Sequence, residues 1–124
     1  MYLIRDHVQD AQRFPLTKLL ELVANSIDTN RIIWTIKKAR GYGEQICEIE
    51  DNLMTMDEVK VTANKLIDIS KDDEQWFYDL ECYNDEGMKF GIIDSNFLFI
   101  EASEKEVSGI IRQFDKVSKI TTVR

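Results

Sequence analysis

The stretch that decides the fold is residues 75–102, QWFYDLECYNDEGMKFGIIDSNFLFIEA. Between 75 and 83 two sets of residues alternate one by one, which is the pattern of a strand with one buried face. The set expected to be buried is Trp76, Tyr78, Leu80 and Cys82. The set expected on the opposite face is Phe77, Asp79, Glu81 and Tyr83. We therefore predict a strand here.

The residues that follow this strand predict a return of the chain. Residues 84–87, Asn-Asp-Glu-Gly, have the composition of a turn, and 88–94 is again rich in β-branched and aromatic residues. Ser95 and Asn96 make a second turn before the strand predicted over 97–102. The result is a three-stranded antiparallel meander.

Three helices are predicted around the meander, over 15–28, 56–69 and 103–117, from apolar residues that recur with helical period. Pro15 suits the first turn of the first helix. The second begins with Thr55 and Glu58 in the spacing of a capping box, and the third with Ser103 and Glu106 in the same spacing.

The remaining segments allow more than one interpretation. Residues 31–40 fit a strand or a helix, and we favour a strand that turns at Gly41 and Gly43 into a second strand over 45–50. Short strands are also expected over 2–5 and 119–123. The prediction is one α+β domain over 1–124, a mostly antiparallel sheet with about three helices packed on one face.

Composition places limits on the class of protein. The 124 residues, with 44% hydrophobic and 31% charged residues, suit one globular domain. Charges interrupt every apolar run before bilayer length, and the N-terminus lacks the apolar stretch of a signal peptide, so we expect a cytoplasmic protein without a membrane span. Cys47 and Cys82 are expected to be reduced packing residues on strands.

Negative charge is concentrated in the middle third of the chain. Residues 44–86 hold 14 Asp/Glu and 3 Lys, whereas residues 1–40 hold 4 acidic and 7 basic residues. Binding to a nucleic acid depends on Lys and Arg that neutralise phosphates. We therefore expect no direct nucleic-acid binding and a partner with a basic surface.

No constellation in the sequence predicts catalysis, a metal or a cofactor. His7 is the single histidine, and no serine stands in a nucleophile elbow. Glu58-Val59-Lys60 spells the ExK of some nucleases but falls within a predicted helix. Residues 41–43 lack the full phosphate-binding fingerprints. The sequence therefore predicts a protein that is not an enzyme.

Aromatic rings mixed with carboxylates on an uncovered sheet face suit a protein interface, because the rings supply buried area and the carboxylates steer a basic partner. The alternative is a solvated sheet with a few partly buried rings. Phe77 and Tyr83 are the expected anchors. The full set of predicted partner-binding residues is Glu48, Glu50, Asp72, Asp73, Glu74, Phe77, Asp79, Glu81, Tyr83 and Glu101.

In its length, its acidity and its lack of catalytic motifs, the chain resembles the small immunity proteins of bacterial toxin systems, including those of contact-dependent growth inhibition. The resemblance implies that the protein binds and blocks a basic toxin domain, such as a nuclease. Alternatives are a nucleic-acid-mimicking inhibitor of a DNA-binding enzyme and a small ligand-binding or enzymatic domain. A homodimer formed through the same sheet is also open.

Overall fold

The predicted meander forms the centre of the sheet. Its strands are β4 (Trp76–Tyr83), β5 (Lys89–Ile93) and β6 (Phe97–Glu101), each antiparallel to the next. The Asn84 side chain holds the first turn, because its Oδ1 accepts hydrogen bonds from the N–H groups of Glu86 and Met88, both at 2.9 Å. This part of the prediction is confirmed.

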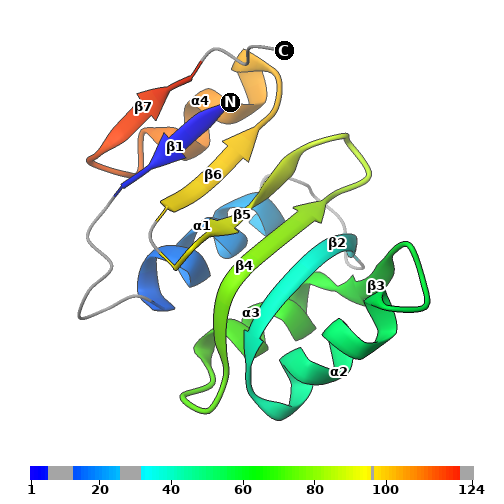
Figure 1. The fold of residues 1–124 in the computed structure, drawn as a ribbon. Coiled ribbons are helices and arrows are strands. Elements are labelled where there is room, and N and C mark those ends of the chain that lie inside the picture. Colours follow the sequence, from blue (N-terminus) through cyan, green and yellow to red (C-terminus); the bar gives the residue numbers. More distant parts are fainter. Residues whose placement is uncertain (6–12, 26–31, 96, 121–124) are drawn as a thin grey trace.

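The computed structural model describes residues 1–5, 13–25, 32–95 and 97–120. Within these ranges β2 (Ile33–Tyr42) and β3 (Val59–Thr62) extend the sheet beyond β4, and β1 (Tyr2–Ile4) and β7 (Val117–Lys119) extend it beyond β6. The strand order is β3-β2-β4-β5-β6-β1-β7, antiparallel throughout (Figure 1). The strand expected over 119–123 ends earlier, and 121–124 lie outside the described residues.

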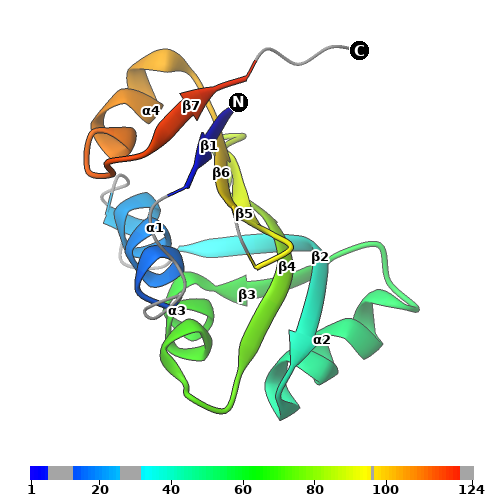
Figure 2. The same cartoon turned by 60° about the vertical axis from the view of Figure 1, so that its left-hand side comes forward.

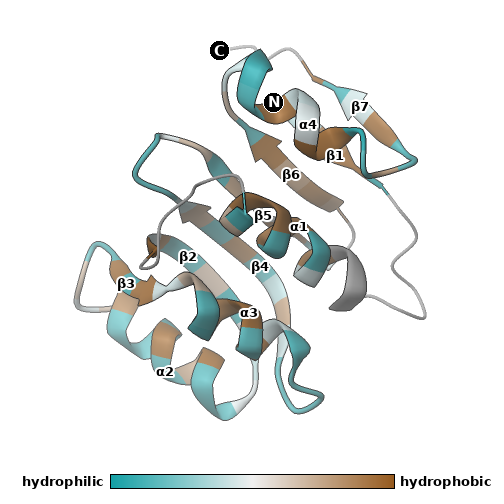
Figure 3. Cartoon of the chain, turned by 180° about the vertical axis from the view of Figure 1, so that it is seen from behind, coloured by the Kyte–Doolittle hydropathy of each residue, from teal (hydrophilic) through white to brown (hydrophobic). Residues whose placement is uncertain are grey.

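In the described part of the chain, four helices cover one face of this sheet: α1 (Arg13–Asn25), α2 (Glu44–Leu53), α3 (Ala63–Lys71) and α4 (Glu104–Ile111). Seen from the helical side, α1 and α3 lie across the strands (Figure 3). Their apolar residues share one core with fully buried sheet residues such as Trp34, Ile36 and Phe90. The α+β prediction is thus confirmed, with one more helix than expected. The other face, which we call the open face, is turned toward the viewer in Figure 1.

The prediction of a strand over 45–50 is wrong. These residues lie in α2, which buries Ile46 and Ile49, three positions apart, against the common core. Cys47 is therefore exposed on a helix, whereas Cys82 is buried in β4 as expected. α2 lies at the end of the molecule opposite β1 and β7 in both Figure 1 and Figure 2.

The predicted helix over 56–69 begins later than expected. Val59 and Val61 pair with Ile36 and Trp34 in β3, and the helix starts only at Ala63. Its cap is Thr62, whose side chain accepts a hydrogen bond from the Lys65 N–H at 3.1 Å. Thr55 and Glu58 do not form a capping box.

The capping box of the third predicted helix is confirmed: the Ser103 hydroxyl accepts from the Glu106 N–H at 3.3 Å and donates to the Glu106 carboxylate at 2.9 Å. This helix ends at Ile111 rather than 117, because the chain returns as β7. The first helix runs over Arg13–Asn25 in place of 15–28, and residues 26–28 lie outside the described residues.

A bulge in β4 changes which residues face the core. Arg40 is opposite Asp79, but the next residue, Gly41, is opposite Phe77, so Tyr78 is an extra residue. Phe77 is consequently buried in the core, and Tyr78 is 38% exposed. The expected alternation is confirmed at Leu80 and Cys82 and is wrong at Trp76, which is half-buried, and at Tyr78.

Candidate protein-binding surface

The start of α2 and the loop before β4 are fixed to each other at one end of the molecule. The Gln75 side-chain oxygen accepts a hydrogen bond from the Ile46 N–H at 3.2 Å. Gly43 has φ +117°, and a Cβ at this position would lie 2.2 Å from the same oxygen. Only glycine permits this close approach. The contact places α2 beside residues 72–75.

We call these two segments, residues 44–53 and 72–75, the acidic end. They contain seven carboxylates and no Lys or Arg. Glu50 accepts a hydrogen bond from the Gly41 N–H at 3.2 Å, and Asp72 accepts one from the Glu74 N–H at 2.9 Å. The next basic residue along the chain, Lys71, forms an ion pair with Glu21 at 3.3 Å. Of the predicted residues, the acidic end unites Glu48, Glu50, Asp72, Asp73 and Glu74.

Two tyrosines lie on the open face where it adjoins the acidic end. Tyr42 is 49% exposed, and its ring centroid lies 6.3 Å from that of Tyr78. Tyr42 comes two residues before Glu44, and half-buried Trp76, its partner across the strands, comes two residues after Glu74. Large amphipathic rings are thus bordered by carboxylates.

Arg40 connects this tyrosine pair to the next residues of the sheet. Its guanidinium lies 5.7 Å from the Tyr78 ring centroid, and its Nε donates to the Asp79 carboxylate at 2.8 Å. Burial alone would raise the pKa of Asp79, but the Asp94 N–H, at 3.0 Å, and the Arg40 guanidinium hold that pKa below its ordinary value. Asp79 is therefore a structural anion rather than an exposed one.

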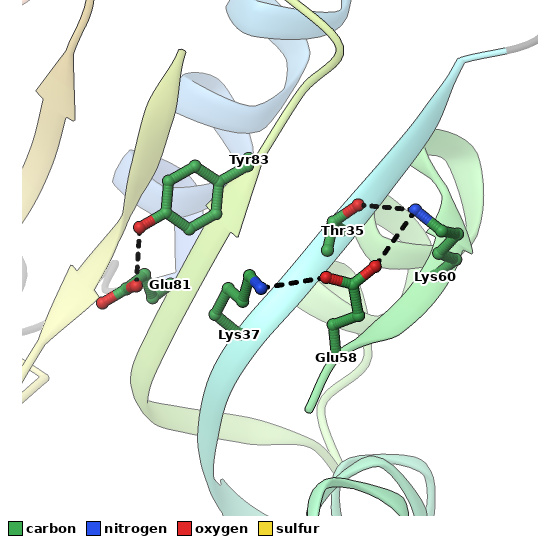
Figure 4. A network of polar contacts seen from close by, with 6 residues as sticks. All are labelled: Thr35, Lys37, Glu58, Lys60, Glu81 and Tyr83. Atoms are coloured by element: carbon green, nitrogen blue, oxygen red, sulfur yellow. Dashed lines mark hydrogen bonds and ion pairs between the residues drawn. The ribbon is translucent and has the colours of Figure 1, made fainter. Parts of the chain in front are cut away.

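The centre of the open face is close to electrically balanced, which corrects the expectation of an acidic face. Its basic side chains are Lys37, Lys38, Arg40, Lys60 and Lys89. Its acidic side chains are Glu58, Asp79, Glu81 and Glu101. Glu58 contacts Lys37 at 2.9 Å and Lys60 at 3.3 Å (Figure 4). These two lysines hold the pKa of Glu58 below its ordinary value.

The remaining predicted residues lie on the open face or in the core. Tyr83 and Glu101 both face Lys89 across neighbouring strands, and the Tyr83 hydroxyl donates to Glu81 at 2.9 Å (Figure 4). Burial, and then this bond to a carboxylate, raise the pKa of Tyr83. Phe77 is only 4% exposed, so its predicted role as an anchor is wrong.

Sequence reasoning missed Tyr42 and Tyr78 as exposed residues. The available signal was Tyr42 beside a turn glycine in an acidic context, but the position of Tyr78 depends on the bulge. In the part of the chain that the structure describes, no group of three or more His, Cys, Asp or Glu could hold a metal ion. The described helices include none that is long and apolar enough to cross a membrane.

Comparison with protein-family models, with curated proteins and with solved structures gave no match.

Proposed function

We propose that this protein is a cytoplasmic, non-catalytic binding module that blocks a basic protein surface, as the immunity proteins of bacterial toxin systems do. The observation that supports it most is the exposed pair Tyr42 and Tyr78, with ring centroids 6.3 Å apart, next to seven carboxylates of the acidic end. The partner is a basic protein, such as a toxin domain, whose active surface this module occludes.

The tyrosine pair supplies the anchors. Tyr, Trp and Arg dominate the energetics of measured interfaces, and the rigid rings of Tyr and Trp bury large areas at low entropic cost. Tyr42, Tyr78 and Trp76 lie together with Arg40, whose guanidinium is held in place by Asp79 at 2.8 Å. A partner that covers these rings would exclude water from them, and this burial would supply most of the binding energy.

The acidic end supplies attraction at a distance. Seven carboxylates without a cation in the same two segments produce a negative potential that accelerates the approach of a basic partner. The distribution also favours a protein partner over nucleic-acid mimicry, because phosphate-like carboxylates would have to follow a long surface. Here the acidic residues of the open face are balanced by lysines and Arg40.

The proposal is tested by site-specific photocrosslinking in the native cell, with p-benzoylphenylalanine in place of Tyr42. We expect the crosslinked protein to be basic and its activity to be abolished by an equimolar amount of this protein. With the purified partner, Tyr42→Ala and Tyr78→Ala should each weaken binding by about 2 kcal/mol or more. The association rate should fall as salt is added.

Tyr83→Ala is the matched control, because Tyr83 lies on the same open face away from the acidic end. It should leave the affinity within about threefold, well under 1 kcal/mol. A partner that loses affinity with Tyr83→Ala and not with Tyr42→Ala would contradict the proposed surface. A captured partner with an acidic surface, bound at a rate independent of salt, would contradict the proposed class of partner.

A further inference from the structure

The centre of the open face is hollowed above Gly91. This residue is opposite Glu81 on β4 and Phe99 on β6, and the residues around it line a hollow of about 200 Å³. A Cβ at Gly91 would lie 1.7 Å from the Leu80 carbonyl oxygen, so the strands are packed too closely there for any other residue. The close approach of β4 to β5 beside the hollow therefore requires glycine at this position.

The floor of the hollow is apolar and its rim is charged. Phe99, 3% exposed, Ile93, 38% exposed, and Met1 line it on the open face, whereas the side chains of Leu80 and Ile92 belong to the core on the other side of the sheet. Phe99 lies on the side of the sheet opposite the main core, so it is buried by its neighbours on the open face. The charged lining residues are Lys38, Lys89, Asp79 and Glu81.

The carboxylates of the rim already have partners, and the ammonium groups do not have ion-pair partners among the described residues. Asp79 accepts from Arg40 Nε and from the Asp94 N–H, and Glu81 accepts from the Tyr83 hydroxyl. Lys38 attracts Asp79 only at longer range, and Lys89 lies 6.0 Å from the Tyr83 ring centroid. The lining side-chain charges are balanced in number, but only Lys38 and Lys89 among them have no hydrogen-bonded or ion-paired partner in the described residues.

We infer that the hollow over Gly91 is a binding site for a carboxylate attached to a short apolar or aromatic group. The apolar group would rest on Phe99 and Ile93, and the carboxylate would pair with Lys38 and Lys89. A cation would be repelled by both lysines. The size is suitable, because a cavity of roughly 150 Å³ holds benzene. This site is separate from the tyrosine pair and stands independently of the proposed function.

The test is a titration with phenylacetate followed by NMR of the Ile93 methyl groups. We expect saturable shifts with a Kd on the order of 1 mM, as suits a ligand of this size. Benzyl alcohol and benzylammonium, which replace the carboxylate with a neutral group and a cation, should bind at least about fivefold more weakly. Equal binding of the three probes, or the absence of saturable shifts with phenylacetate, would overturn the inference.

Variants locate the charge that matters. Lys38→Met and Lys89→Met should each weaken phenylacetate binding by about fivefold or more, since each removes one charge-assisted contact. Lys37→Met is the matched control, because Lys37 neighbours Lys38 but pairs with Glu58 and does not line the hollow. A loss of binding with Lys37→Met as large as with Lys38→Met would overturn the assignment.

The carboxylate could come from a free small molecule or from the C-terminal residue of a peptide. A second titration with the peptide acetyl-Ala-Ala-Phe, which ends in a free carboxylate, and with its C-terminal amide separates the two sources. Tighter binding of the acid peptide than of phenylacetate assigns the site to a chain terminus, and tighter binding of phenylacetate assigns it to a small molecule. Equal affinity of acid and amide peptides, together with no preference for phenylacetate over benzyl alcohol, would contradict the inference.

Discussion

The open face and the acidic end both contain carboxylates from the middle third of the chain, but the two segments of the acidic end contain no Lys or Arg, whereas the strands of the open face contain both signs of charge. On the open face, strand pairing places lysines and Arg40 of β2, β3 and β5 beside Glu58, Asp79, Glu81 and Glu101. At the acidic end, α2 and residues 72–75 bring carboxylates together. The distribution of charge along a sequence therefore locates a charged surface only after the strand pairing is known.

The largest effect is expected at the centre of the open face. Gly91→Ala should lower the free energy of unfolding by about 3 kcal/mol, because the added Cβ would force β4 and β5 apart at the Leu80 carbonyl. Urea unfolding followed by circular dichroism measures this change. Gly109→Ala is the control: α4 leaves space around Gly109, and alanine there should stabilise the protein by roughly 0.5–1 kcal/mol. Unchanged stability of Gly91→Ala would mean that the strands do not approach as described.

The next prediction compares the loss of stability when one carboxylate from each region is neutralised. Asp79→Asn should cost about 2 kcal/mol in the free energy of unfolding, because buried Asp79 bonds both Arg40 and the Asp94 N–H. Glu48→Gln should change it by less than about 0.5 kcal/mol, since Glu48 is exposed. Equal costs for the two variants, measured by urea unfolding, would remove the distinction between structural and available carboxylates.

The dependence on pH follows from the lowered pKa of Asp79. Its ordinary value is 3.8, and the folded-state value is lower, so its contribution to stability is complete above pH 3.8. The contribution is lost as pH falls through the lowered value. The difference in unfolding free energy between the protein and Asp79→Asn should therefore be constant near neutral pH and shrink below about pH 4. A difference that grew on acidification would contradict this assignment.

The smallest changes in the free energy of unfolding are expected for charge reversals, and they should have opposite signs at the acidic end and on the open face. Glu48→Lys should stabilise the protein by about 0.3 kcal/mol, because a lysine four residues after Glu44 replaces two like charges with an ion pair. Glu81→Lys should destabilise it by about 1 kcal/mol, because Tyr83 loses its acceptor and a third ammonium joins Lys38 and Lys89. Both changes in the free energy of unfolding can be measured by chemical unfolding at low salt. The same sign for both substitutions would contradict the account.

The local sequence pattern was sufficient to predict the helices and strands for which it agrees with the tertiary contacts they make. The meander has runs of β-branched and aromatic residues separated by turn residues, and Ser103 with Glu106 is a capping box with an apolar stripe after it. The segment 55–62 carries conflicting signals. Thr55 and Glu58 have capping-box spacing, yet Val59 and Val61 gain more by pairing with β2, and Glu58 is held by Lys37 and Lys60.

The candidate site was only partly predictable, for a reason of register. The acidic residues were visible in the sequence, but Glu48 and Glu50 were placed on a strand and Phe77 on the wrong face. One extra residue in β4 exchanges the surroundings of Phe77 and Tyr78, and no local signal marks it. The gathering of α2 with residues 72–75 depends on the long-range contact of Gln75 with Ile46.

The most direct test of the account is a map of surface potential from NMR relaxation by a cationic and an anionic nitroxide. The account predicts that amides of residues 44–52 and 72–75 are relaxed much more strongly by the cationic probe, since the local potential is negative there. Amides of residues 35–38 and 81–83 should be relaxed nearly equally by both probes. Equal preference for the cationic probe over both regions would contradict the claim that the acidic end, and not the open face, presents the excess charge.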